Sequence, residues 1–459
     1  MAGEIEVLVK QVMNRLQGGT TGSGLGIFKN MNDAVEACAR AQKEYMKCSL
    51  ADRTRIINAI RRVVYDNAEE LSRLTVEETR MGNYEDKVAK NRLVADKTPG
   101  VEDLVSEAMT GDNGLTLIEL SPFGVIGAIT PTTNPTETLF CNSIGMLAAG
   151  NGVVFSPHPT AKNVSLKTID LINRAIIDAG APPNLITAVE NPTLEETNVM
   201  VKHPRVNMLV ATGGPGVVKV VLSSGKKAIG AGAGNPPAVV DESANIEKAA
   251  IDIIKGCSFD NNLPCVAEKE VLVEEKVADY LVFSMKGSGL AHFIEDPALI
   301  KRLEEKIISG ENPNKNFIGR SAQVIAESVG LKIDGKIKVL CVEVPFEHPF
   351  VQHELMMPVL PIVRVKDFDD AMKKAIEVEH GYRHTAIMHS RNVEHLSALA
   401  KAMQTTIFVK NAPSYAGIGV GGEGCTTFTI AGPTGEGLTS ARTFTRKRRC
   451  VLADSFNIR

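Results

Sequence analysis

The fold is decided between Phe123 and Pro135, in the stretch Phe-Gly-Val-Ile-Gly-Ala-Ile-Thr-Pro-Thr-Thr-Asn-Pro. Residues 123–130 carry no charge, which is typical of a strand buried on both faces. Short β-branched runs follow along the chain and alternate with helical stretches; they are Val153–Ser156, Leu185–Val189, Met208–Ala211 and Ala238–Val240. Alternating strands and helices form right-handed crossovers, so the sequence predicts a parallel, doubly wound α/β sheet.

A second alternating series begins near Ile246 and predicts a second α/β domain. Its expected strands are 270–273, 339–344, 360–365, 385–388 and 406–409, and residues 277–329 are expected to be helical. The tail from Ala416 is rich in Gly and Thr, with Phe428, Ile430 and Phe444 as its apolar anchors. We expect this tail to lie on another subunit or on the other domain.

Composition excludes several classes of protein. The chain has 459 residues, 44% of them hydrophobic and 23% charged, which is typical of a globular protein. A net charge of -3 argues against a broad nucleic-acid footprint. The eight cysteines show no CxxC spacing, which disfavours a zinc site and favours reduced thiols in a cytosol. Glycines and prolines interrupt the apolar stretch 138–161, and residues 1–17 lack a secretory signal, so we expect neither a membrane span nor export.

The first 26 residues predict a separate unit. Apolar side chains recur at spacings of three and four within residues 1–17, which indicates one face of a short helix. Residues 18–26 contain five glycines and form a flexible linker. Because so short a helix is marginal alone, its apolar face must dock either on its own globule or on another protein.

Two glycine-rich motifs are possible phosphate-binding sites, and one of them is the better candidate. Gly419–Gly424 matches GxGxxG, but no amphipathic helix follows it, so we do not expect a dinucleotide site there. The turn Ala211-Thr-Gly-Gly-Pro-Gly216 is more favourable, because it joins an expected strand to an expected helix whose free amides can face a phosphate.

Two polar groups are candidates for catalysis. Cys265 lies in a polar junction between a helix and a strand, unlike Cys38 and Cys141, which belong to helical patterns. As a nucleophile it requires a thiolate, and hence nearby positive potential or a base. Asn134 follows the first buried strand, at the edge where parallel sheets bind ligands. It is either a turn residue or a donor aimed at an oxyanion.

These sites, taken together, resemble those of one family. The segments 126–135, 150–157, 212–214 and 354–359 and the cysteine Cys265 occur in the order and spacing of aldehyde dehydrogenases. The chain resembles most closely the CoA-acylating members that act on propionaldehyde, acetaldehyde and butyraldehyde, over nearly all of residues 27–455. The resemblance implies an aldehyde dehydrogenase-like α/β fold with two doubly wound domains and a small β oligomerisation arm. It assigns 27–112 and 122–233 to an NAD-binding domain, 234–425 to a catalytic domain, and 113–121 and 426–459 to the arm.

The resemblance also implies roles for single residues. Cys265 would be the nucleophile, and Asn134 with the Cys265 amide would form the oxyanion hole. Glu354 would bind the nicotinamide ribose. The other cofactor-binding positions would be Thr130, Pro131, Thr132, Ser156, Pro157, Thr212, Gly213 and Gly214. Ser156 stands where many relatives have a lysine, which puts that contact in doubt.

The segment Ala231–Pro237 is the most informative departure from hydrolytic relatives, which carry a water-activating glutamate there. No carboxylate lies between Ser223 and Val240, so a thioester on Cys265 would persist against water and CoA would become its acceptor. The expected reaction is short-chain aldehyde, NAD (or NADP) and CoA to acyl-CoA and NADH, in a homodimer or homotetramer. A non-acylating dehydrogenase and a cofactor-independent cysteine hydrolase are the alternatives. Relatives in bacterial microcompartments carry a similar N-terminal helix, so the resemblance implies a shell protein as partner of residues 1–17.

Overall fold

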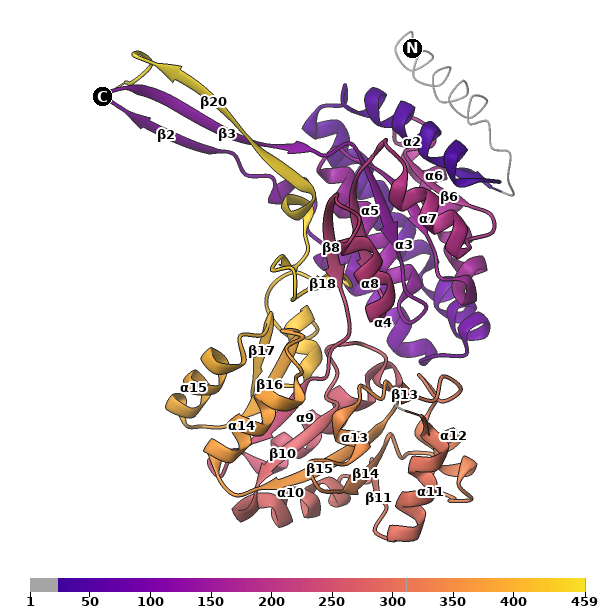
Figure 1. Cartoon of the computed structure of the whole chain (residues 1–459), viewed down its shortest axis with the longest axis vertical. Helices are drawn as coiled ribbons and strands as arrows, with labels where there is room; N and C mark the ends of the chain where they lie inside the picture. Colours follow the sequence, from indigo (N-terminus) through magenta and orange to yellow (C-terminus); the bar gives the residue numbers. More distant parts are fainter. Residues whose placement is uncertain (1–23, 311, 459) are drawn as a thin grey trace.

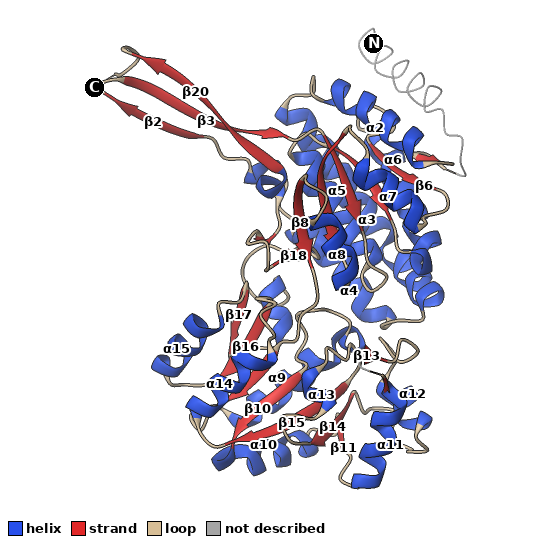
Figure 2. Ribbon diagram, in the orientation of Figure 1, coloured by secondary structure: helices blue, strands red, loops and turns tan. Residues whose placement is uncertain are grey.

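The computed structural model describes residues 24–310 and 312–458, which form two α/β domains and a projecting arm (Figures 1 and 2). The helix expected within residues 1–17, and most of the glycine-rich linker, lie outside the described residues.

The first domain is built on a parallel six-stranded sheet with the order β1-β6-β5-β4-β7-β8. Its strands are β1 (Ile27–Phe28), β4 (Val125–Ile129), β5 (Gly152–Ser156), β6 (Ile186–Val189), β7 (Val206–Thr212) and β8 (Lys227–Ala231). Its helices are α2 (Met31–Tyr45), α3 (Leu50–Thr79), α4 (Tyr84–Lys97), α5 (Pro135–Ala148), α6 (Lys162–Asp178), α7 (Leu194–Lys202) and α8 (Pro215–Leu222). The charge-free stretch 123–130 contains β4, which is buried throughout at the centre of the sheet.

The second domain is built on a parallel seven-stranded sheet with the order β11-β14-β15-β10-β9-β16-β17. Its strands are β9 (Pro237–Val240), β10 (Glu270–Glu274), β11 (Ala291–Phe293), β14 (Val339–Glu343), β15 (Val359–Val365), β16 (Thr385–His389) and β17 (Ile407–Lys410). Its helices are α9 (Ile246–Ser258), α10 (Glu275–Gly287), α11 (Pro297–Ile307), α12 (Ala322–Ser328), α13 (Pro349–Gln352), α14 (Phe368–Val378) and α15 (Val393–Met403). The predicted parallel α/β architecture is therefore confirmed.

The arm is a three-stranded antiparallel sheet that projects from the first domain (Figure 1). It consists of β2 (Glu107–Gly111), β3 (Gly114–Pro122) and β20 (Thr445–Ala453). The bounds 113–121 and 426–459 that the resemblance implies for the arm contain most of β3 and all of β20, but they do not include β2. The basic run Arg446–Arg449 belongs to β20 and is exposed to solvent.

Two other expectations need correction. The region 277–329 is not helical throughout, because Ala291–Phe293 forms the edge strand β11; three residues are too few to show a strand periodicity. The short strand β8 was also missed, since its alanines and glycine have low β propensity and it forms only through pairing with β7. The tail does find a surface within its own chain: Phe444 is buried and lies against Gly145 of α5.

Candidate active site

The first sheet contributes its carboxyl edge to the candidate site. At β4 the order in which the chain adds strands to the sheet changes from one side to the other. From β4 the chain proceeds to β5 and β6 on one side, and then to β7 and β8 on the other. Ile129 is in register with Ser156 of β5 and with Ala211 of β7. The residues that follow these strands therefore begin side by side, in the crevice where open α/β sheets bind ligands.

Several predicted cofactor positions lie at this edge. The buried Thr130 hydroxyl has no hydrogen-bond partner within the described chain. Gly214 caps α8 without a side-chain bond, and added Cβ atoms at Gly213 or Gly214 would meet little or nothing, so the first amides of α8 are accessible. Ser156, in contrast, is buried and its hydroxyl lies 2.8 Å from that of Thr197.

The remaining predicted positions are also polar or turn residues of this edge. The Thr132 and Thr160 hydroxyls are 2.8 Å apart, and so are those of Thr212 and Thr429. Pro131 is half-buried and Pro157 is buried.

The second sheet contributes its amino edge, where its strands begin, to the candidate site. Gly234, Lys269, Glu354 and His384 all precede strands of this sheet, and those strands are neighbours in the order β15-β10-β9-β16. A Cβ on Gly234 would lie 2.8 Å from the Cys265 carbonyl oxygen and 2.9 Å from the His384 ring. Only glycine therefore lets the cysteine loop and the histidine approach this closely.

Cys265 is a partly buried thiol in an unusual electrostatic setting. Its pKa is raised to about 12, first by burial and then by the nearby Glu354 carboxylate, and the charges of Lys269 and Lys90 oppose this rise. Burial also raises the pKa of Glu354 to about 7. The sequence has no carboxylate between Ser223 and Val240, but the Glu354 carboxylate lies near the Cys265 sulfur.

Lys269 holds the loop that carries Cys265. Its ammonium donates to the Asn262 carbonyl at 2.9 Å and to the Asn262 side-chain oxygen at 2.7 Å. Asp260, Asn261 and Asn262 all have left-handed backbone, with φ of 49°, 55° and 66°. This conformation costs free energy in non-glycine residues, and the side-chain bonds of the loop offset that cost.

Asn134 lies at the start of α5 and is 6% exposed. It is the N-cap residue of α5, but its side chain makes no capping hydrogen bond with that helix. Its side-chain oxygen accepts a hydrogen bond of 2.5 Å from Lys90 of α4. Lys90 also binds Asp260 of the cysteine loop, at 2.6 Å. The structure thus connects the predicted oxyanion donor with the loop of the predicted nucleophile.

His384 is buried beside this site. Its Nδ1 lies 2.8 Å from the Thr385 hydroxyl, and its Nε2 has no partner within the described chain. Burial and the charge of Lys269 lower its pKa to about 4, so the imidazole is neutral near pH 7.

Sequence reasoning missed the buried charges Lys90, Asp260, Lys269 and Glu137. A lysine in a helical pattern ordinarily indicates a solvated face. The only available signal was the spacing of Lys87, Lys90 and Asn91 on one side of α4, all of which are fully buried. Their acidic partners come from distant segments and cannot be paired from one sequence.

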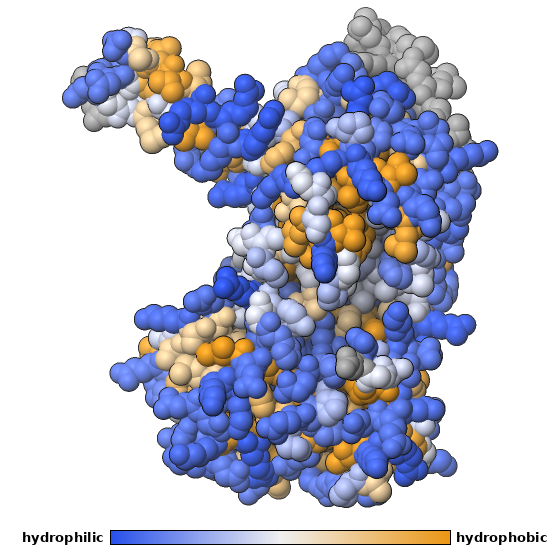
Figure 3. Space-filling model, viewed as in Figure 1, coloured by the Kyte–Doolittle hydropathy of each residue, from blue (hydrophilic) through white to orange (hydrophobic). Residues whose placement is uncertain are grey.

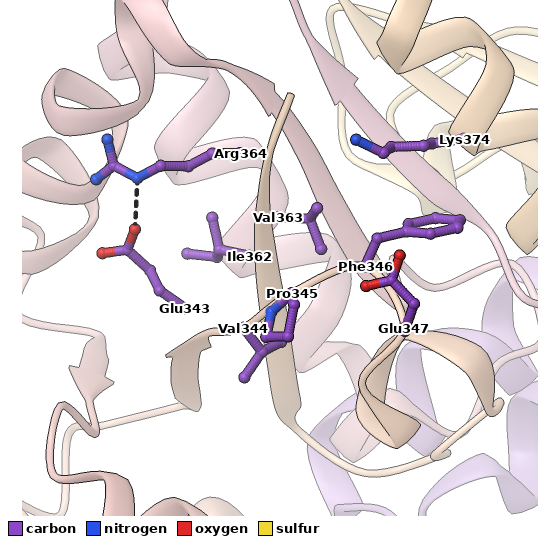
Figure 4. A pocket seen from close by; sticks show the side chains of 9 residues that line it. All are labelled: Glu343, Val344, Pro345, Phe346, Glu347, Ile362, Val363, Arg364 and Lys374. Carbon is purple, nitrogen blue, oxygen red and sulfur yellow. Dashed lines mark hydrogen bonds and ion pairs between the residues drawn. The ribbon is translucent and has the colours of Figure 1, made fainter. Parts of the chain in front are cut away.

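A hollow at the opposite edge of the second sheet does not belong to this site. It is lined by the ends of β14 and β15 and by Lys374 of α14 (Figure 4). Its arginine, Arg364, forms ion pairs with Glu343 at 2.8 Å and Asp279 at 2.7 Å, so little positive charge is left for a ligand.

On the first domain, apolar side chains gather over α8 (Figure 3), where Val220 is 46% exposed and Leu222 is 43% exposed.

Within residues 24–310 and 312–458, none of the helices is long and apolar enough to cross a membrane. In the same residues no group of three or more His, Cys, Asp or Glu side chains is placed to hold a metal ion.

Comparison with known proteins agrees with this geometry. The aldehyde dehydrogenase family model matches residues 25–297. Propanal dehydrogenase (CoA-propanoylating) of Salmonella typhimurium is 49% identical over 99% of both chains. The chain belongs to the aldehyde dehydrogenase family.

Solved structures agree over the whole fold. The propionaldehyde dehydrogenase of Rhodopseudomonas palustris, solved with bound CoA and an acylated cysteine, is 61% identical with a TM-score of 0.93, over 95% of this chain and 99% of that one. A propionaldehyde dehydrogenase from the fucose utilisation microcompartment of Clostridium phytofermentans is 52% identical, also with a TM-score of 0.93, over 95% and 100% of the chains.

Proposed function

We propose that the chain is a CoA-acylating aldehyde dehydrogenase, which converts a short-chain aldehyde, NAD and CoA to acyl-CoA and NADH through a thioester on Cys265. The observation that carries this proposal is that Lys90 contacts both Asn134 and Asp260, which connects the predicted oxyanion donor to the loop that carries Cys265. The similarity to relatives named as CoA-propanoylating supports it.

The first domain, with residues 27–112 and 122–233, offers groups suited to a dinucleotide. The Gly214 amide at the start of α8 fits a pyrophosphate, and the Thr130 hydroxyl, which has no partner within the described chain, fits a polar group of the cofactor. When bound, NAD supplies the hydride acceptor. Glu354, from the catalytic domain 234–425, is the proposed partner of the nicotinamide ribose. NADP is the alternative cofactor, since Ser156 replaces the lysine of many relatives.

The thiolate of Cys265 attacks the aldehyde carbon, and the carbonyl oxygen becomes an oxyanion. The Asn134 amide and the backbone N–H of Cys265 stabilise that charge by hydrogen bonds. The C–H bond then breaks with loss of hydride, which leaves a thioester on the sulfur. CoA thiolate attacks the thioester carbon, and Cys265 leaves as thiolate. Lys269 favours the anionic sulfur at both ends of the cycle.

One feature favours a second candidate, a dehydrogenase that releases free acid. Glu354 lies near Cys265 with a pKa of about 7, so it can accept a proton from water. In the acylating mechanism we expect Glu354 to bind the nicotinamide ribose during turnover. It then does not activate water, and CoA is the acceptor of the acyl group.

The test combines mass spectrometry with kinetics. Protein incubated with propionaldehyde and NAD, without CoA, should carry an acyl adduct at Cys265, and Cys265→Ser should carry none. Steady NADH formation should require CoA. Full turnover to carboxylate without CoA would instead establish the acid-releasing activity, and absence of any adduct would refute the nucleophile assignment. Aldehydes of two to six carbons would then define the substrate range.

We further propose that the arm formed by β2, β3 and β20 joins subunits into a homodimer or homotetramer. The exposed fractions of Met109, Val451 and Leu452, which are 51%, 59% and 44%, support this role. Such apolar surface on a projecting sheet is a site for a partner.

Residues 1–17 are the proposed address for a microcompartment shell protein, which would place the enzyme in the microcompartment lumen. The relative from a fucose utilisation microcompartment supports this location. Residues 1–18 fused to a fluorescent reporter should give foci in shell-forming cells, and a version with the apolar face changed to Gln should not. Diffuse signal from the unchanged fusion would contradict the proposal.

A further inference from the structure

A buried cluster of charges lies beside the Asn134 amide. Lys87 and Lys90 of α4, Glu137 of α5 and Asp260 of the cysteine loop all have fully buried side chains. Two positive and two negative groups balance, which a buried cluster requires because an unpaired buried charge is costly. The cluster joins both domains, since α4 and α5 belong to the first domain and Asp260 lies between α9 and β10 of the second.

The Lys90 ammonium donates two hydrogen bonds, to Asn134 Oδ1 at 2.5 Å and to Asp260 Oδ2 at 2.6 Å, and it forms an ion pair with Glu137 Oε1 at 2.9 Å. An ammonium only donates, so the Asn134 oxygen must face it; the reversed amide would set donors against donors. The Asn134 NH2 is then turned away and makes only a long 3.4 Å contact with the Thr133 hydroxyl in the described chain.

We propose that Lys90 is a positioning residue for the reaction: it fixes the orientation of the Asn134 amide and, through Asp260, the position of the Cys265 loop. This inference rests on the proposed function, in which Asn134 and the Cys265 amide hold the oxyanion together. Pre-organised donors stabilise such a charge without reorganising during the reaction. One ammonium thereby sets the spacing between the two halves of the oxyanion hole.

Lys87 provides the matched comparison. Its ammonium also binds Asp260, at 3.1 Å, and the Thr133 carbonyl, at 3.2 Å, but it does not contact the Asn134 side chain. It is as deeply buried as Lys90. A purely structural cluster would therefore respond similarly to the loss of either lysine.

The test is a double-mutant cycle of Lys90→Met and Asn134→Ala, read as the single-turnover rate of NADH formation with propionaldehyde. Loss of one oxyanion donor costs about 10²- to 10³-fold, so we expect about a 10- to 100-fold loss for Lys90→Met in the native background. In the Asn134→Ala background the same change should cost less than about threefold, because coupled groups are non-additive and Lys87 still binds Asp260 of the Cys265 loop. kcat should fall with little change in the KM for NAD, and Lys87→Met should lose less than Lys90→Met.

Lys90→Met leaves Glu137 without its ion pair, so its folding must be secured. Lys90→Met/Glu137→Gln removes one charge of each sign and keeps the Lys87–Asp260 pair; its rate should fall like that of Lys90→Met. Equal losses from Lys90→Met in both backgrounds, or no loss at all, would overturn the positioning role alone. An unimpaired Asn134→Ala would overturn the oxyanion assignment itself, and the positioning role with it.

Discussion

At the scale of single residues, the reactivity of Cys265 depends on opposing neighbours. Burial and Glu354 disfavour the thiolate, whereas Lys269 and Lys90 favour it. A raised pKa lowers the thiolate fraction at neutral pH and therefore slows the reaction of the free thiol with electrophiles. Binding events that neutralise or displace Glu354 would activate it.

We therefore expect Glu354→Gln to accelerate alkylation of Cys265 by iodoacetamide. The Glu354 pKa of about 7 means that the carboxylate is mostly ionised at pH 8 and mostly protonated at pH 6. Because each unit of pKa changes the thiolate fraction about tenfold, the variant should react several-fold faster at pH 8 and at nearly the native rate at pH 6. Glu354→Asp, which keeps the charge, is the control. Equal rates at pH 8 would contradict the electrostatic role of Glu354.

The sequence predicts the reacting groups but not their setting. Cys265 and Asn134 are predicted because each lies at a junction between a helix and a strand and because the resemblance implies a catalytic role for each. Lys90 and Asp260 do not, since they are 170 positions apart and their contact exists only after the two domains have packed. A buried ion pair between distant segments leaves no periodic pattern in one sequence.

At the scale of elements, the Cys265 region is held by Glu268, which precedes β10. Its carboxylate accepts hydrogen bonds from the Ser414 amide at 2.8 Å and the Ser414 hydroxyl at 2.6 Å. Burial raises its pKa from 4.5 to about 7. A carboxyl group with a raised pKa in the folded state contributes stability at low pH, and that contribution is lost as the pH rises from about 4.5 to 7.

Glu268→Gln should remove this pH dependence, because an amide does not ionise. The effect on the free energy of unfolding is on the order of 3 kcal/mol at most, from about 1.4 kcal/mol per pKa unit. We expect the Tm of the variant, measured relative to the unchanged protein, to rise by several degrees between pH 5 and pH 7.5. Parallel Tm curves over this range would show that Glu268 does not titrate there.

Helix α9 approaches Glu268 closely at one glycine. A Cβ on Gly256 would lie 2.0 Å from Glu268 Oε2, so Gly256→Ala must displace the carboxylate from Ser414. We expect a loss of about 1–3 kcal/mol, the usual cost of overpacking a core. Gly287→Ala, at the end of α10, is the control: its Cβ meets nothing within 4 Å, so stability should be kept. Chemical denaturation measures both variants, and equal stabilities would contradict the close packing.

At the scale of the whole molecule, alternating strands and helices predicted two parallel sheets, whereas their mutual arrangement came only from the structure. The carboxyl edge of the first sheet and the amino edge of the second supply the two halves of the candidate site. The arm was only partly predictable. Its strand β20 is a run of exposed, largely basic residues that becomes a strand only by pairing with β3.

Two exposed apolar residues of the arm are suited to test its role in assembly. Val451 and Leu452 follow one another on β20, so their side chains lie on opposite faces of the arm. Replacing both by Lys should prevent a second subunit from covering either face, because burying an unpaired ammonium costs far more than the lost apolar contact. Light scattering after size exclusion should then give the mass of a single chain, with an unchanged far-UV spectrum. Arg448→Gln, on the same strand, should keep the native assembly. A multiple-chain mass for the Lys variant would mean that subunits associate through another surface.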